Sequence, residues 1–470
     1  MATRQAQPPG GGHEESPQPE LKKAIGPGLL LLFIVGDVLG TGIYALTGQV
    51  ANKVGGALWI PFLAAFIAAF LTAFSYLELV GKYPRAAGAA LYTQKAFGIH
   101  FLTFMVAFAV MSSGMTSAGS AARAVGADYL PQVLTWLPDT EVAVIAVAVA
   151  MLAVFGAINL RGVSESVWVN VVFTVIELIG LAIIIVMASA ALLSGQGDFG
   201  RTLEIDTGQQ SAFFAVVAGT SLAFFAMVGF EDSVNMAEET TNPKIFPKAM
   251  LIGLSIAALI YVTVALLSSA VLPTAELIGD NQQDPGAGAL LRVLEAAAPW
   301  FPLGIFAAIG VFAVSNSALI NMLMASRLVY GMSREGIIPR IFARVARGRR
   351  TPWVAIIFTT AIAMCLTAYA DVSLLGSTTS LLLLVVFTIV NIAVLVLRRQ
   401  PVEHEHFKAP TIVPVLGALM CAFLVGPWSG REAQEYEIAV VLLGVGVVLW
   451  LISYVGQRLA SRRRLSRNDA

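Results

Sequence analysis

The sequence predicts an all-α, polytopic membrane protein with twelve transmembrane helices. Hydrophobic residues make up 57% of the chain and charged residues only 12%, whereas roughly a quarter of the residues in a soluble domain are charged. Apolar runs of about 17 to 25 residues, long enough to cross a bilayer as a helix, recur along the chain. Because lipid offers no hydrogen bonds to the backbone, each run is expected to be helical. The predicted spans cover residues 25–49, 58–80, 100–123, 142–158, 168–193, 212–237, 249–272, 301–328, 353–370, 376–397, 412–427 and 438–454.

Basic residues gather on one side of the predicted membrane. If the N-terminus is cytoplasmic, all but five of the 29 Lys and Arg residues fall in cytoplasmic tails, loops and helix ends. The five on the opposite side are Lys53, Arg123, Arg201, Arg292 and Arg431. This asymmetry follows the positive-inside rule and predicts an even number of spans with both termini in the cytoplasm. The chain is therefore expected to be a multi-pass protein of the cell membrane.

The two ends of the chain are predicted to be cytoplasmic tails. Residues 1–23 are rich in Pro, Gly and Glu and poor in large apolar side chains, a composition typical of disordered segments. Residues 458–470 form a basic tail. No cleavable signal peptide is expected, because its charged, apolar and cleavage regions are missing from the N-terminus. The two cysteines, Cys365 and Cys421, both lie in apolar runs, so neither a disulfide framework nor a metal site nor any other cofactor is predicted.

Two glycine-containing stretches interrupt predicted spans at matched positions. Residues 40–42 (GTG) lie near the middle of the first span, and residues 229–231 (GFE) lie near the middle of the sixth. Small residues also let two membrane helices pack closely. However, two breaks at equivalent depth, one of them followed by two carboxylates, are typical of a transporter's binding site.

The positions of the breaks also predict how the chain is divided. Each break opens a unit of five predicted helices, residues 24–195 and residues 196–398. Because five is odd, the second unit enters the membrane upside down relative to the first, which predicts a 5+5 inverted repeat. Residues 399–457 hold the last two spans, which we interpret as accessory or oligomer-contact helices without chemistry of their own.

A broken membrane helix has binding properties that a continuous helix lacks. Unwinding one or two residues frees backbone N–H groups at the start of a half-helix, where the helix dipole attracts a carboxylate. It also frees carbonyl groups at the end of the other half-helix, and these attract an ammonium group or a cation. A zwitterion fits both ends.

At these residues the chain resembles the amino acid-polyamine-organocation (APC) permease superfamily. The matching motifs are GDVLGTGIY at 36–44, YLE at 76–78, FAMVGFE at 225–231, AEE at 237–239, NP at 242–243 and SR at 326–327, with Pro84, Gly88, Pro247, Gly336 and Pro339. The resemblance extends in order through the first ten spans. It implies a LeuT-like fold and alternating access around an amino-acid site at the midplane of the membrane.

The resemblance also implies which residues bind the substrate. The backbone at Thr41, Gly42 and Ile43 would hold the carboxylate, and carbonyl groups near Val38, Phe225 and Val228 would hold the amine, with Gly229 permitting the second break. Phe225 matches an aromatic residue that closes over the substrate, although it is equally well interpreted as a packed core residue. Side-chain preference stays open, because the positions facing the site on spans three and eight, Ser112, Met115, Asn316 and Ile320, are small, polar and apolar in turn.

Five acidic residues occur within the predicted spans. A charge at bilayer depth costs about 2.5 to 3.5 kcal/mol on one scale unless it is hydrated, paired or neutralised. Glu78 lies near a span end and is interpreted as structural. Glu231 matches a position where the superfamily often has an acid, and we expect it to act as a protonation switch. Asp37 and Asp232 replace residues that the motifs make small or apolar, and on the LeuT-like fold both lie in the cytoplasmic halves of the broken helices.

Glu177 is the main departure from the superfamily pattern. It falls where many sodium-independent members carry a Lys whose charge stands in for a sodium ion. An acid there is open to three interpretations, namely a proton carrier, a ligand for a cation, or a neutral hydrogen-bonding group. Titration coupled to Asp37, Glu231 and Asp232 is possible, and these four acids are the predicted coupling residues.

These features predict a secondary active transporter of amino acids that is coupled to protons. The alternative is an exchanger of amino acids or polyamines without net proton coupling. An enzyme is not expected, because the four histidines lie in tails, loops or a span end and leave no nucleophile–base pair or metal cluster at membrane depth. A channel is disfavoured because no filter sequence repeats. The expected partners are an amino acid or polyamine, protons and the lipid bilayer, without nucleic acid, and the oligomeric state stays open.

The predicted topology can be tested by labelling single cysteines from outside intact cells. Cysteines introduced at Ser16 and at Ser466 should stay unlabelled, because the distribution of basic residues places both ends in the cytoplasm. A cysteine in the loop between the fifth and sixth spans should react and serves as the positive control. Ready labelling of either end would contradict the topology.

Overall fold

The computed structural model describes residues 26–83, 88–138, 140–205, 211–235, 245–279, 286, 288–334, 338–346, 349 and 351–468, apart from the side chains of residues 163–167, 235 and 455–468. Several features named above lie outside the described residues. These are the predicted tail at 1–23, Pro84, the AEE and NP motifs, Gly336 and the last two residues of the predicted basic tail.

All regular secondary structure in this described part is helical. Ten of its helices are long and apolar enough to cross a membrane. They are α1 with α2 (Pro27–Val54), α3 (Trp59–Lys82), α5 with η1 and α6 (His100–Val133), α7 (Glu141–Arg161), most of α8 (Val163–Leu193), α9 with η3 and α10 (Ala212–Val234), α11 (Phe246–Val271), α14 (Leu303–Arg334), α16 (Val372–Leu397) and the first part of α18 (Ala433–Asn468).

Two further apolar helices occupy the positions of the predicted ninth and eleventh spans. They are α15 (Trp353–Tyr369), with 17 residues, and α17 (Ile412–Val425), with 14 residues. Both are shorter than the other ten. The remaining connections hold α4 (Gly88–Phe97), η2 (Phe199–Leu203), α12 (Thr274–Ile278), α13 (Ala289–Ala297), η6 (Arg340–Ala343) and η7 (Pro427–Ser429).

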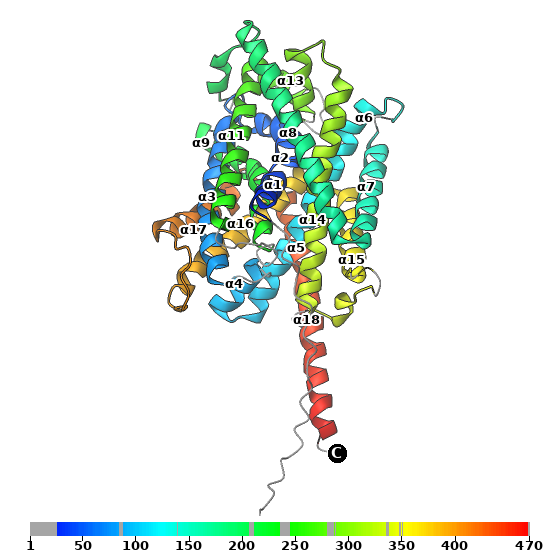
Figure 1. Ribbon diagram of the computed structural model, residues 1–470, viewed down its shortest axis with the longest axis vertical. Coiled ribbons are helices and arrows are strands. Elements are labelled where there is room, and N and C mark those ends of the chain that lie inside the picture. Colours follow the sequence, from blue (N-terminus) through cyan, green and yellow to red (C-terminus); the bar gives the residue numbers. More distant parts are fainter. Residues whose placement is uncertain are drawn as a thin grey trace, which may run out of the picture.

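The long helices lie side by side in one bundle (Figure 1). Helix α4 lies at the end of the bundle from which α18 extends, and α13 lies at the opposite end; we call these the α4 end and the α13 end. Helix α5 is buried along nearly its whole length and packs against α14 and α16. In α7 and α18, by contrast, only 28% of the most apolar stretch is buried. These two helices therefore present apolar side chains outward, as a lipid-facing helix does.

The first predicted break is present between α1 (Pro27–Val38) and α2 (Thr41–Val54). Gly40 has a φ of +100°, a conformation that residues with a Cβ rarely adopt. A Cβ at this position would also lie 2.3 Å from Oγ of Ser317 in α14. Both the backbone angle and the close packing therefore require glycine.

The second predicted break is also present, in the sixth span. Helix α9 (Ala212–Ala223) passes into the 3₁₀ turn η3 (Phe224–Met227), and Val228 and Gly229 separate this turn from α10 (Phe230–Asn235). Gly229 has a φ of +122°. A Cβ there would lie 2.7 Å from the carbonyl oxygen of Asp37 in α1. The second break thus lies directly against the end of α1.

A buried ion pair joins α3 to the end of α16. Arg398 donates to both carboxylate oxygens of Glu78, at 2.8 and 2.6 Å, and the Ala409 N–H donates to the same carboxylate at 2.9 Å. The Glu78 carboxylate raises the pKa of Arg398 by accepting these hydrogen bonds. The contacts agree with the structural interpretation of Glu78, since they fix one helix to another across 320 residues of sequence.

Replacing Glu78 should lower the stability of the bundle. Glu78→Gln removes the charge that faces Arg398, and breaking a buried pair by removing one partner costs about 3 to 5 kcal/mol. The melting temperature of the purified protein in detergent should therefore fall by several degrees. Glu141→Gln is a suitable control, because it also removes one carboxylate from an Arg–Glu pair but its side chain is 55% exposed. Equal melting temperatures for the two variants would contradict a structural role for Glu78.

Candidate functional site

The two breaks pack against each other through backbone atoms. A Cβ at Gly42, in the first turn of α2, would lie 2.4 Å from the Cα of Ala226 in η3. Because glycine has no side chain, the N-terminal turn of α2 and the unwound part of the sixth span are in direct contact. The space between these two elements is therefore closed at Gly42.

Two backbone groups predicted to bind the substrate have partners within the protein. The N–H of Thr41 donates to Oγ of Ser317 at 3.3 Å. The carbonyl of Val38 accepts a hydrogen bond of 2.5 Å from the hydroxyl of Tyr261 in α11. A helix N-terminus and C-terminus leave such groups without intrahelical partners, so these side chains satisfy the groups that the first break frees. Ile43, the last of the three residues predicted to bind the carboxylate, is fully buried.

The predicted residues on the sixth span are also placed by local contacts. The N–H of Val228 donates to the carbonyl of Phe225 at 3.2 Å, and the N–H of Gly229 donates to Oε2 of Glu231 at 2.9 Å. Glu231 therefore caps the start of α10, much as an N-terminal carboxylate caps other helices. The ring of Phe225 is 5% exposed and belongs to the apolar core, close to Gly376 in α16.

A small cavity lies next to the second break, on the side of the α4 end. Helix α10 packs against α4, and the cavity is lined by Val228, Glu231 and Asp232 from the sixth span with Ser113 from α5 and Asn321 from α14. Its volume of about 20 Å³ holds a water molecule but not an amino acid. The predicted acids Glu231 and Asp232 thus border this cavity beside the second break.

The other two predicted acids lie at the breaks themselves. A Cβ at Gly40 would come within 3.5 Å of Oε1 of Glu177, and one at Gly229 within 3.1 Å of Cγ of Asp37. Both carboxyl groups are buried, and none of their four oxygens has a hydrogen-bond partner of ordinary geometry among the described residues. An ionised carboxylate in such a position costs several kcal/mol. Such a position therefore favours a neutral carboxyl group or a neighbouring cation.

A polar layer surrounds Glu177 between α1, α8 and α14. Asn316 donates to Oγ1 of Thr174 at 3.2 Å and to the carbonyl of Gly36 at 3.4 Å, and it accepts from Asn170 at 3.1 Å. Asn316 is also close enough to interact with Glu177. Within the described residues no group of three or more His, Cys, Asp or Glu side chains is arranged to hold a metal ion.

The residues expected to face the site on spans three and eight are buried and do not line the small cavity. Ser112, Met115 and Ile320 are buried among other helices, and Asn316 belongs to the polar layer. The cavity is lined instead by neighbours on the same helices, namely Val110, Ser113, Gly114, Asn321, Met324, Ala325 and Leu328. Adjacent residues on a helix point about 100° apart, and the apolar pattern of a helix buried on all sides does not indicate which face borders a cavity.

Comparison with known proteins gives a consistent result over nearly the whole chain. A family model described as amino acid permease matches residues 29–450. The branched-chain amino acid permease BcaP of Bacillus subtilis is 27% identical over 429 residues, which is 87% of this chain and 89% of that protein. The methylthioribose transporter of the same organism is 27% identical over 90% of this chain and 91% of its own length. Cationic amino acid transporter 4 of Mus musculus is 28% identical over 82% of this chain and 61% of its own length.

Substitutions at Gly42 should disturb the contact between the two breaks. Gly42→Ala places a Cβ against the backbone of Ala226, and overpacking of this kind costs about 1 to 3 kcal/mol, which a lower melting temperature should report.

Gly42→Leu should abolish the rise in melting temperature that a bound substrate causes, while the protein still folds. Gly331→Ala is the control, because its Cβ would meet no atom within 4 Å. Retained substrate affinity in Gly42→Leu would argue against a site at the first break.

Proposed function

The chain belongs to the amino acid permease family, and from this premise we propose that it is a secondary active transporter that moves amino acids by alternating access. The observation that carries the proposal is the pair of glycine breaks, which face each other at Gly42 and Ala226 and each have a buried carboxyl group beside them. The relatives are named as permeases and transporters, and the chain is accordingly a membrane transport protein and not an enzyme.

The substrate site is proposed to form where α2 and η3 separate. The N–H groups of Thr41, Gly42 and Ile43 then bind the carboxylate, because they stand in the first turn of α2. The carbonyls of Val38, Phe225 and Val228 bind the amine, and Phe225 covers the bound molecule. In the described arrangement the N–H of Thr41 donates a hydrogen bond to Ser317, and Gly42 packs against Ala226. Substrate binding therefore requires exchange of these contacts.

The topology that fits this site has twelve spans with the LeuT-like repeat. Helices α15 and α17 are the shorter ninth and eleventh spans. Residues 24–195 and 196–398 form the two inverted units. Residues 399–457 form the two accessory helices. Both termini are placed in the cytoplasm of a cell-membrane protein by the distribution of basic residues. The α4 end then faces the cytoplasm, and the cavity at Asp232 marks the cytoplasmic route to the site.

Proton coupling is proposed to depend on Glu177, with Glu231 or Asp232 as its partner and Asp37 coupled to both. Support comes from the burial of Glu177 and Asp37, whose carboxylate oxygens have no hydrogen-bond partner of ordinary geometry among the described residues. A carboxyl group in this setting binds a proton on one side of the membrane and releases it on the other only if its surroundings change. A cation bound at Glu177 would satisfy the same oxygens. The second candidate is exchange without net proton movement, favoured by the position of Glu231 and Asp232 in the cavity, where they can bind a substrate amine.

The substrate is to be identified by counterflow into liposomes that contain the purified protein. The relatives are named for branched-chain amino acids, cationic amino acids and methylthioribose, so the screen includes these compounds and polyamines. Counterflow of an amino acid supports a carrier. Absence of counterflow with every compound, from protein that is folded and inserted, would refute the proposed function.

The coupling proposal is tested with Glu177→Gln. This variant keeps the shape of the side chain but cannot bind or release a proton, so we expect it to retain exchange and to lose accumulation driven by an inward proton gradient. Glu141→Gln, which changes an exposed carboxylate, serves as the control and should behave as wild type. If Glu177→Gln accumulates substrate under the gradient as well as wild type does, Glu177 is structural and the coupling assignment is wrong.

A further inference from the structure

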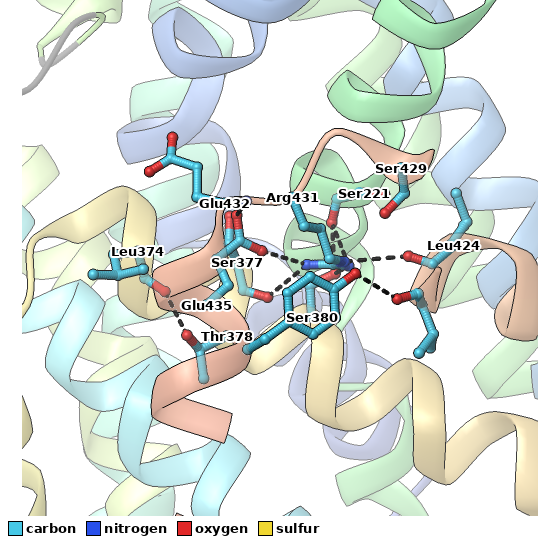
Figure 2. A network of polar contacts seen from close by, with 12 residues as sticks. Ser221, Leu374, Ser377, Thr378, Ser380, Leu424, Ser429, Arg431, Glu432 and Glu435 are labelled. Carbon is cyan, nitrogen blue, oxygen red and sulfur yellow. Dashed lines mark hydrogen bonds and ion pairs between the residues drawn. The ribbon is translucent and has the colours of Figure 1, made fainter. Parts of the chain in front are cut away.

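Arg431 is a buried cation that reaches the broken sixth span from a distant part of the sequence. It lies in the short link between η7 and α18, and its side chain is only 1% exposed. Glu435, in the first turn of α18, forms an ion pair with it, with 2.9 Å between Nη1 and Oε2. Figure 2 shows the guanidinium group at the centre of a ring of oxygen atoms.

The oxygens around Arg431 belong to three other helices. Its Nε donates to the carbonyl of Leu424 at the end of α17, at 3.2 Å. Its Nη1 donates to the carbonyl of Ser377 in α16, at 2.9 Å. Its Nη2 donates to Oγ of Ser380 in α16, at 3.1 Å, and to the carbonyl of Ser221 in α9, at 3.4 Å. One side chain thus connects α9, α16, α17 and α18.

The contact with Ser221 is the one that concerns the break. Ser221 lies in the last turn of α9, where a helix leaves carbonyl groups without intrahelical partners, and η3 begins three residues later. The hydroxyl of Ser380 donates to the same carbonyl at 2.6 Å. The end of this half-helix is therefore held by donors from α16 and from the link before α18.

Stability alone does not explain the buried ion pair between Arg431 and Glu435. Burial lowers the pKa of Arg431, against the opposing effect of Glu435, and well-packed apolar residues often replace a buried pair without loss of stability. A planar guanidinium with five donors does, however, fix several oxygens in one geometry. The network therefore indicates a geometric role.

We propose that Arg431 is a positioning residue for transport. With Glu435 and Ser380 it fixes the end of α9, and so sets the position of the unwound residues 224–229, which carry Phe225 and Val228. This inference rests on the proposed function. It makes the segment that joins the last two spans part of the substrate site's support, although that segment does not touch the substrate.

The test uses the pair of substitutions R431M and E435Q, which removes both charges together and leaves neither one buried alone. Ser380→Ala is a milder variant that removes the second donor to Ser221 and one acceptor of Arg431 but leaves both charges in place. The matched control is the pair R123M and E141Q, because Arg123 and Glu141 form an ion pair of 2.6 Å between α5 and α7 without contact to the break. Arg431→Lys keeps the charge but loses the fork of donors.

Two measurements are made on each variant. Hydrogen exchange of the amides at residues 224–230 should speed up roughly tenfold in the R431M and E435Q variant, the size expected for loss of a hydrogen bond to a charged group, and should not change in the control. Transport in liposomes should show KM raised by a similar factor with Vmax less affected, because the binding residues are displaced. Arg431→Lys and Ser380→Ala should each show the same two changes, faster exchange and a raised KM, to a smaller extent.

Unchanged exchange at residues 224–230 would overturn the proposal, whether or not the protein transports anything. So would faster exchange with an unaltered KM, or an equal KM change in the control pair. If the double variant does not fold, the same criteria apply to Ser380→Ala. Wild-type protein that transports no compound in the screen would refute the proposed function, and the exchange measurement would still decide whether Arg431 positions the segment.

Discussion

Backbone groups that are freed inside a membrane must find partners within the protein, and the centre of this molecule is organised around that constraint. The first break is held by a hydroxyl from α14 and a hydroxyl from α11. The second break is held on one side by Glu231 and on the other by Ser380 and Arg431. Every one of these partners except Glu231 comes from a distant segment of the chain. The geometry of the breaks therefore depends on the packing of the other helices in the bundle.

The fold was predictable from the sequence to the extent that its signals are local. Long apolar runs give the helices, and the two breaks are visible because a positive φ requires glycine. The partners of the breaks were not predictable, since Ser317 lies 276 residues from Thr41 and no pattern in the chain connects them. Arg431 was visible only as a basic residue on the sparsely charged side. The residues that line the small cavity, such as Ser113, were not predictable either, because a fully buried helix has no periodic pattern that identifies the face beside a cavity.

The buried acids could be recognised in the sequence, but their positions beside the breaks could not. A carboxyl group in an apolar span stands out in any sequence, but the structure adds that Glu177 lies beside Gly40 and Asp37 beside Gly229. A change of charge at either carboxyl group acts directly on the backbone of a break. Conversely, a movement of either break changes the surroundings of the carboxyl group next to it. Under the proposed function, ion occupancy and substrate access are linked by contact and need no long relay between them.

The contact between Gly42 and Ala226 has a consequence for how specificity can change. Both residues meet through main-chain atoms, so neither can become larger without moving a helix. The wall contributed by α5 and α14, which includes Ser113 and Met324, carries no such restriction. Under the proposed function, side chains on that wall can therefore change in size without disturbing the contact through which the two broken spans meet.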